Sequence, residues 1–187
     1  MAALLSQLRA HIDAWFAASA REEFSWRLGP IGTALPDFRV ARFDPATPEA
    51  PWAYVSLGAS EVEREGERTE FLIVSPEESP RHVETLAMVT YFHADPRYGL
   101  TEGAIVDIGR PWLEGSAADH LLVSRPLPYG PDFEWLETSN GVVRFLWLVP
   151  ITSGEAEFAR QQGTAALEDA LEAGGVNVID GGRPAVV

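Results

Sequence analysis

The most constraining feature of this sequence is an apolar run at residues 141–152, which reads GVVRFLWLVPIT. Between residues 142 and 149 only Arg144 is polar, so the run predicts a strand that is covered on both faces. Valine and aromatic side chains favour the extended backbone. Pro150 lacks the N–H group that a ladder bond needs, and we therefore expect the strand to end there.

A helix is expected directly after this strand. Thr152 and Glu155 have the spacing of a capping box, in which each side chain accepts a hydrogen bond from the other residue's backbone N–H. The helix should begin near Ser153 and continue to about residue 173, with Gly163 as its weakest point. The side chains expected on its buried face are Phe158, Leu167 and Leu171.

A hairpin is expected before the apolar run. Residues 132–137, DFEWLE, alternate between polar and apolar side chains and predict a strand. Ser139, Asn140 and Gly141 follow, and these residue types suit a tight turn. The apolar run would then be the second strand of the hairpin.

Shorter patterns predict the remaining elements. An amphipathic helix is expected within residues 1–20, a loop at 28–37 and a charged hairpin tip at 61–68. A second helix should run from Ser79 to Asp95, with Val83, Leu86, Ala87 and Tyr91 on its buried face. Further strands are expected at 38–43, 52–57, 69–74, 104–108, 120–124 and 176–179.

Strands outnumber helices in this pattern and mostly connect as hairpins. This favours an α+β fold with a largely antiparallel or mixed sheet and flanking helices. The chain has 187 residues, which suits one domain over residues 1–187.

Charge and composition exclude several classes of function. The chain carries 28 acidic and 14 basic residues, a net charge of −14, and all the basic residues are arginine. A negative field of this size repels phosphate backbones, so nucleic acid is not expected as a partner. The alternative is that the acidic surface only keeps the protein in solution. No apolar run approaches the ~20 residues of a membrane span, and no leader pattern is present, so we expect a cytoplasmic protein.

Residues that would carry catalysis or bind a cofactor are hard to find. Cysteine is absent, the four histidines lack the spacing of a zinc site, and no glycine-rich phosphate loop occurs. Ser60 follows a glycine and an alanine, but Val62 stands where a nucleophile elbow needs glycine. Glu70 is a lone acid in a strand, either in a salt bridge or at the strand's exposed start. We therefore predict no catalytic, cofactor or metal site.

Aromatic residues near loops are the better candidates for a partner-binding site, because tryptophan and tyrosine dominate interface hot spots. An acid beside an aromatic ring would suit recognition of arginine or lysine on a partner. The alternative is that these rings fill the core. The candidates are Tyr98, Trp112, Tyr129, Asp132, Glu134 and Trp135.

An ordered set of segments resembles the suppressor of fused (SUFU) domain family over about residues 35–183. The segments are PDFRVARFDP, WAYVSLGAS, TEFLIV, GVVRFLWLVPIT, GEAEFARQQGTAALEDAL and GVNVID. The resemblance implies the same α+β class. In animals, family members hold and restrain transcription factors, and single-domain bacterial relatives look like immunity proteins encoded beside polymorphic toxins. Nothing is carried over to residues 1–34 or 95–118.

The resemblance and the missing catalytic motifs imply a protein–protein interaction domain rather than an enzyme. The lysine-free composition suggests a bacterium with a GC-rich genome, so we expect an immunity-type protein that binds and neutralises a cognate toxin. The acidic charge would suit a basic toxin domain as that partner. Two alternatives stay open. A small-ligand sensor would have an enclosed apolar pocket, and a hydrolase using carboxylates and histidine would have a deep pocket with two acids or an acid–histidine pair.

Overall fold

The computed structural model describes residues 2–64 and 66–187. The chain forms two compact units. Unit 1 comprises residues 1–100 and 125–147, and unit 2 comprises residues 101–124 and 148–187. The single domain expected from the sequence stays a prediction.

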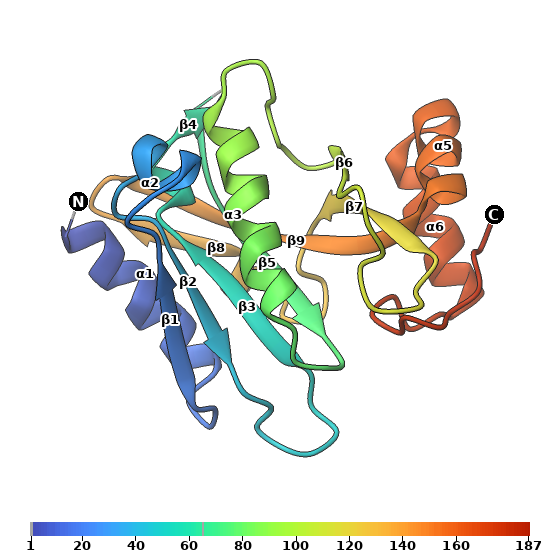
Figure 1. The fold of residues 1–187 in the computed structure, drawn as a ribbon, viewed down its shortest axis with the longest axis horizontal. Coiled ribbons are helices and arrows are strands. Elements are labelled where there is room, and N and C mark those ends of the chain that lie inside the picture. The colour runs from blue at the N-terminus through green and yellow to red at the C-terminus, as the bar shows by residue number, and fades with distance from the viewer. Residues whose placement is uncertain (1, 65) are drawn as a thin grey trace. The chain divides into compact units, whose positions relative to one another are not determined.

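Unit 1 contains most of the sheet and the helices α1 to α4 (Figure 1). Its helical elements are α1 (Ala2–Trp15), α2 (Pro30–Ala34), η1 (Ala59–Glu61), α3 (Pro80–Ala94) and α4 (Pro131–Glu134). Its strands are β1 (Arg21–Ser25), β2 (Arg39–Phe43), β3 (Trp52–Leu57), β4 (Glu63–Arg64), β5 (Glu67–Ser75), β8 (Trp135–Thr138) and the first part of β9 (Gly141–Thr152).

The strand order in unit 1 is β1-β2-β3-β5-β9, with β4 beside β5 and β8 beside β9. All these neighbours are antiparallel except β5 and β9, which run parallel with Glu70 opposite Phe145. The predicted α+β class with a mostly antiparallel sheet is therefore confirmed.

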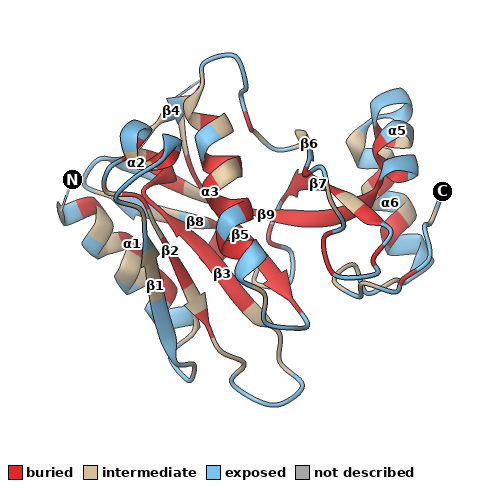
Figure 2. Ribbon diagram, viewed as in Figure 1, coloured by how far each residue is buried: buried red, intermediate tan, exposed pale blue. Residues whose placement is uncertain are grey.

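Helices α1 and α3 cover opposite faces of this sheet. His11 of α1 lies 4.9 Å from the ring of Phe145, whereas His93 of α3 lies 5.3 Å from the ring of Phe71. The register pairs Phe71 with Leu146, and side chains alternate along a strand, so Phe71 and Phe145 point to different faces. Figure 2 shows the buried residues concentrated along the central strands.

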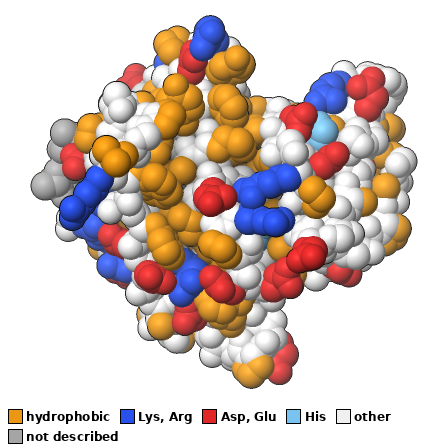
Figure 3. All heavy atoms as spheres, in the orientation of Figure 1, with side chains coloured by type: hydrophobic (Ala, Val, Ile, Leu, Met, Phe, Trp, Pro, Cys, Tyr) orange, Lys and Arg blue, Asp and Glu red, His pale blue; other side chains and the backbone are white. Residues whose placement is uncertain are grey.

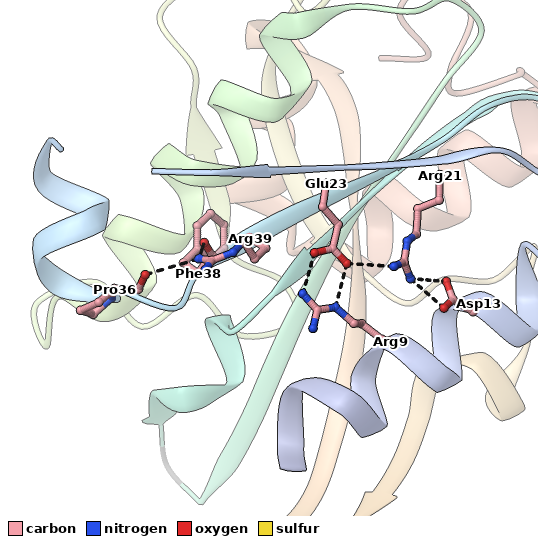
Figure 4. A network of polar contacts seen from close by, with 7 residues as sticks. All are labelled: Arg9, Asp13, Arg21, Glu23, Pro36, Phe38 and Arg39. Atoms are coloured by element: carbon pink, nitrogen blue, oxygen red, sulfur yellow. Dashed lines mark hydrogen bonds and ion pairs between the residues drawn. The ribbon is translucent and has the colours of Figure 1, made fainter. Parts of the chain in front are cut away.

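Strand β1 is held at the edge of the sheet by ion pairs to α1 (Figure 4). Arg9 donates to both carboxylate oxygens of Glu23, at 2.8 and 2.6 Å. Arg21 lies 2.6 Å from Asp13 and 3.2 Å from the same Glu23 carboxylate. The hydrogen bond from Arg9 lowers the pKa of Glu23. No local sequence pattern predicts this strand, because ion pairs to a helix distant in the sequence hold it in place.

Unit 2 contains β6 (Ile105–Asp107), β7 (Ala118–Ser124), the last part of β9, α5 (Ser153–Gln162) and α6 (Thr164–Gly174). Strands β6 and β7 are antiparallel, and the strand order places β7 between β6 and β9. The predicted capping box is confirmed, since Thr152 and Glu155 exchange both side-chain-to-backbone hydrogen bonds. Gly163 breaks the expected long helix into α5 and α6, and its φ of 95° explains why a glycine is needed there.

Several predicted elements were wrong. Residues 28–37 are not all loop, because Pro30 begins α2. Residues 131–134 form a helical turn instead of a strand, since Pro131 is preset for a first helical position and both Phe133 and Glu134 are buried.

Three further expectations were also wrong. Strand β9 continues past Pro150 to Thr152, and its pairing with β5 ends at Trp147, so no bond to β5 needs the missing N–H. No strand forms at residues 176–179. Tyr91 is 42% exposed and not on the buried face of α3, where His82 and His93 lie instead.

Among the residues that the structure describes, no helix has the length and apolarity to cross a membrane.

Candidate functional site

The structure brings most of the predicted partner-binding residues into one segment of unit 1. Tyr129, Asp132, Glu134 and Trp135 lie in and just before α4 and β8. Tyr98 belongs to unit 1 as well, on the loop after α3. Trp112 is in unit 2, is only 3% exposed, and donates its backbone N–H to the Ala118 carbonyl. It is therefore part of the core of unit 2.

Trp135 is the most favourable of these residues for contact with a partner, because its indole is exposed and also held in place. It is 45% exposed and lies opposite Arg144 in the β8–β9 hairpin. The Arg144 Cζ atom is 4.8 Å from the centre of the indole ring, which is a cation–π arrangement.

Arg144 is in turn held by Glu134. The Nε and Nη2 atoms of Arg144 are both 2.7 Å from Oε1 of Glu134, and each of the two side chains is 11% exposed. The carboxylate, the guanidinium and the indole thus form a stack whose outermost member is Trp135. Glu134 was predicted as an acid that recognises arginine or lysine on a partner, and its carboxylate instead pairs with Arg144 of the same chain.

The short helix α4 explains why two consecutive residues can reach Arg144 from different directions. Pro131 starts the helix and Glu134 ends it. Trp135 has an extended backbone, with φ of −116° and ψ of 125°. The backbone therefore changes from helix to strand between the two side chains.

The β8–β9 hairpin presents further exposed residues beside Trp135. Side chains two apart on a strand share a face, so Glu137 lies beside Trp135, and its cross-strand partner is Val142. Val142 is 49% exposed although it lies in the apolar run that was expected to be covered on both faces. We call Trp135, Glu137, Val142 and Arg144 the Trp135 face.

Two acids at or near this face have no compensating cation. The side chains of Glu137 and Asp132 are exposed, and neither carboxylate has a hydrogen bond or ion pair to any residue that the structure describes. This differs from Glu134, which Arg144 neutralises. The Trp135 face therefore combines an ordered aromatic ring with a carboxylate that is free to pair with a partner.

Tyr129 supports this face from within rather than forming it. Its ring is 4.9 Å from that of Phe133 and 5.8 Å from that of Phe16, and Trp15 of α1 packs edge-on at 6.4 Å. Burial raises the pKa of Tyr129 to about 12, so its phenol stays neutral. This aromatic cluster fixes α4 against α1.

Tyr98 belongs to a second, separate group of exposed rings in unit 1. Its ring is 5.5 Å from Phe92, and the Arg97 guanidinium lies 5.5 Å above it. The side-chain hydrogen bond from Arg97 lowers the pKa of Asp95 to about 2. A shallow open depression adjoins this group, and in Figure 3 hydrophobic side chains gather over α2 and α3. The depression is lined by Ala34, Tyr91, Ala94, Asp95, Pro96 and Arg97.

Glu70 was expected in a salt bridge or at an exposed strand start, and both expectations were wrong. The side chain is fully buried and accepts hydrogen bonds from the hydroxyls of Ser56 and Ser60 and from the backbone N–H groups of Gly58, Ala59 and Ser60. Burial raises the pKa of Glu70, and these hydrogen bonds oppose the shift. The carboxylate ties the turn after β3 to β5, which is a structural role.

The histidines show no arrangement suited to metal binding. No group of three metal-ligating side chains occurs in residues 2–64 and 66–187. His82 Nε2 lies 3.0 Å from Ser75 Oγ, but both residues are buried and Ser75 donates to the Glu77 carbonyl. Burial lowers the pKa of His93 to about 4, so this side chain is neutral.

An acid–histidine pair does occur in unit 2, where Asp119 lies 2.7 Å from His120 Nδ1. The pair lines neither the depression beside α3 nor a second depression, which lies beside α6 in unit 2. The first depression contains one acid and no histidine, and the second contains neither. Both depressions are open to solvent, unlike the enclosed pocket that a ligand sensor would need.

Comparison with known proteins points to one family. The model of the Suppressor of fused protein (SUFU) family matches residues 35–184. The crystal structure of a putative SUFU homolog from Neisseria gonorrhoeae FA 1090 has a TM-score of 0.89 and 35% identity, and the alignment covers 98% of this chain and 97% of that chain.

More distant structures share the fold. Drosophila Suppressor of Fused has a TM-score of 0.75 at 18% identity, with 98% of this chain and 51% of that chain covered. A chain of the Sufu–Fu complex has a TM-score of 0.71 at 16% identity, with coverages of 98% and 92%.

A curated relative carries a more specific name. Immunity protein YqcF of Bacillus subtilis (strain 168) is 35% identical over 68 residues, which is 36% of this chain and 35% of YqcF. The match therefore spans about a third of that relative's length.

Proposed function

The chain belongs to the suppressor of fused (SUFU) family, and on that premise we propose that it is a non-catalytic protein-binding domain that neutralises a cognate toxin as an immunity protein. The observation that carries the proposal is the Trp135 face, where an exposed indole is held by Arg144 beside the uncompensated carboxylate of Glu137. Ordered aromatic side chains are typical interface hot spots, because little rotamer freedom is lost when they bind.

Two relatives support a protein partner. One structure of this fold comes from the Sufu–Fu complex, and one relative in sequence is named an immunity protein. The complex motivates a protein partner, and the name of the immunity protein motivates a toxin as that partner.

The acidic charge supports a basic partner. The chain has a net charge of −14, and many of its arginines are already neutralised by acids of the same chain, as in the pairs Arg144–Glu134 and Arg68–Glu63. The remaining negative field would attract a cationic toxin domain. Binding would then neutralise the toxin by covering the surface that carries its activity.

The test uses the toxin gene encoded nearest to this protein's gene. The toxin is expressed from an inducible promoter in a bacterial host, with the wild-type protein, Trp135→Ala or Leu28→Ala supplied from a second plasmid. Leu28 is a matched control because it is 86% exposed and lies outside the Trp135 face. We expect the wild type and Leu28→Ala to restore growth and Trp135→Ala to restore it poorly.

Complex formation between the purified proteins is measured in parallel. Restored growth without a complex would contradict neutralisation by binding. If Trp135→Ala protects as well as the wild type, the Trp135 face is not the binding surface. Tyr98→Ala would then test the second group of exposed rings.

A further inference from the structure

We infer that the Trp135 face receives an arginine side chain of the partner, with the guanidinium stacked on the open side of the Trp135 indole and paired with Glu137. This inference rests on the proposed protein-binding function and specifies the chemistry of the partner at that surface.

The protein already contains this arrangement on the inner side of the indole. Arg144 lies 4.8 Å from the ring centre, and Glu134 holds its guanidinium at 2.7 Å. The contacts follow the order carboxylate, guanidinium, indole, and only the indole is well exposed. Cation–π attraction acts on both sides of an aromatic ring, so a second guanidinium can stack on the outer side.

The outer side of the indole is available. Trp135 is 45% exposed, and no aromatic ring or second guanidinium packs on it among the residues that the structure describes. Glu137 leaves the same face of β8 two residues further on, roughly 6.5–7 Å along the strand. A guanidinium over the indole can therefore reach this carboxylate, which repeats the inner arrangement in reverse order.

Arginine fits this site better than lysine or an acidic side chain. Its planar guanidinium stacks on an indole and still presents N–H groups at its edge for a carboxylate, whereas an ammonium group is compact and more strongly hydrated. The methylene groups of an arginine would also cover Val142, which is 49% exposed. Acidic partner residues are disfavoured, because both Glu137 and the nearby Asp132 would repel them.

The test does not need the natural partner. The protein is labelled with 5-fluorotryptophan, and the Trp135 resonance is assigned by its loss in Trp135→Phe. Three peptides of the form acetyl-Gly-X-Gly-amide are titrated, where X is arginine, lysine or citrulline. Citrulline has nearly the shape of arginine without its charge. The other five tryptophans, from a total of six, serve as internal controls.

We expect the arginine peptide to shift the Trp135 resonance in a saturable way. The lysine peptide should bind more weakly and the citrulline peptide should have no saturable effect. Glu137→Gln should weaken binding of the arginine peptide about two- to fivefold, and this variant is safe for folding because Glu137 is exposed. Equal responses to all three peptides, or an unchanged affinity in Glu137→Gln, would overturn the inference.

The result also separates this inference from the proposed function. If the peptides fail while Trp135→Ala still abolishes protection against the toxin, the face binds a partner but not through arginine, and the inference is wrong. If the arginine peptide binds as expected and no toxin is neutralised, the inference is supported and the toxin assignment is wrong.

Discussion

Arg183 and Glu155 form a buried ion pair that joins the C-terminal segment of unit 2 to the start of α5. Two guanidinium nitrogens of Arg183 lie 2.7 Å from the two carboxylate oxygens of Glu155, and the side chains are 5% and 0% exposed. Glu155 also accepts hydrogen bonds from the backbone N–H groups of Thr152 and Val186. One carboxylate thus completes the capping box and fixes the last residues of the chain.

Replacing Arg183 with methionine should destabilise the protein by about 3–5 kcal/mol, because the Glu155 carboxylate would stay buried without its cation. Urea unfolding followed by circular dichroism measures the change. Arg160→Met is the matched control, since Arg160 and Glu157 form an exposed pair at 3.8 Å, and it should cost about 0–1 kcal/mol. Equal effects of the two substitutions would show that burial of the pair adds nothing.

The same pair should make unit 2 sensitive to acid. Burial alone would raise the pKa of Glu155, but the hydrogen bonds from Arg183, Thr152 and Val186 outweigh it and lower the pKa below its ordinary value of 4.5. The unfolded chain therefore takes up the proton first as the pH falls, so this contribution is full above about pH 4.5 and declines below it. Unfolding curves of the wild type and Glu155→Gln should differ most near neutral pH and converge in acid. A constant difference from pH 7 to pH 3 would contradict the shift.

Glu70→Gln should destabilise unit 1 by at least about 2 kcal/mol, because an amide NH₂ replaces an oxygen that accepts hydrogen bonds and leaves buried donors without an acceptor. Both carboxylate oxygens accept, Oε1 from Ser60 and Gly58 and Oε2 from Ser56 and Ala59. Glu137→Gln, on an exposed acid, should change stability by less than about 0.5 kcal/mol. Thermal unfolding of both variants checks this, and equal melting temperatures would count against the structural role of Glu70.

Two glycines of the α5–α6 region should respond to alanine in opposite directions. Gly154 lies within α5 and an added Cβ would meet only Thr152 Oγ1 at 3.9 Å, so Gly154→Ala should stabilise the helix by about 0.4–1 kcal/mol. Gly163 has φ of +95°, so Gly163→Ala should cost about 1–3 kcal/mol through backbone strain. The urea midpoints of the two variants measure both effects. Midpoints that shift in the same direction would contradict the predicted opposite roles of the two glycines.

The association rate with a cationic toxin should fall steeply as salt rises, because the net charge of −14 accelerates encounter. At low salt the rate should approach ~10⁸–10⁹ M⁻¹s⁻¹. Trp135→Ala should act mainly on the dissociation rate and raise it by about tenfold or more. Surface plasmon resonance at several salt concentrations measures the association and dissociation rate constants. An association rate that does not depend on salt would rule out electrostatic steering.

Elements whose signals are local could be predicted from the sequence. The capping box needs only Thr152 and Glu155, and the start of α3 needs only Ser79 and Pro80. The apolar run predicted β9 because few other structures accommodate so many consecutive apolar side chains. The family and the α+β class followed from the order of such segments, and both are confirmed.

Elements that depend on distant partners could not be predicted. Strand β1 has a highly charged sequence and is held by Arg9 and Asp13 of α1. Alternation at residues 132–137 suggested a strand, but its first half is helical because Pro131 favours a first helical turn and Phe133 packs against α1.

The candidate site was predicted by residue type and corrected by burial. Sequence alone determined that Trp135 and its acidic neighbours were candidates, because exposed aromatic residues beside charge suit an interface. Only the tertiary structure decided that Trp112 is in the core, that Glu134 is neutralised by Arg144, and that the exposed carboxylate of Glu137 lies beside Trp135 on the same face of β8. The physical reason is that exposure and charge pairing depend on which strands and helices come together, and no local pattern records those contacts.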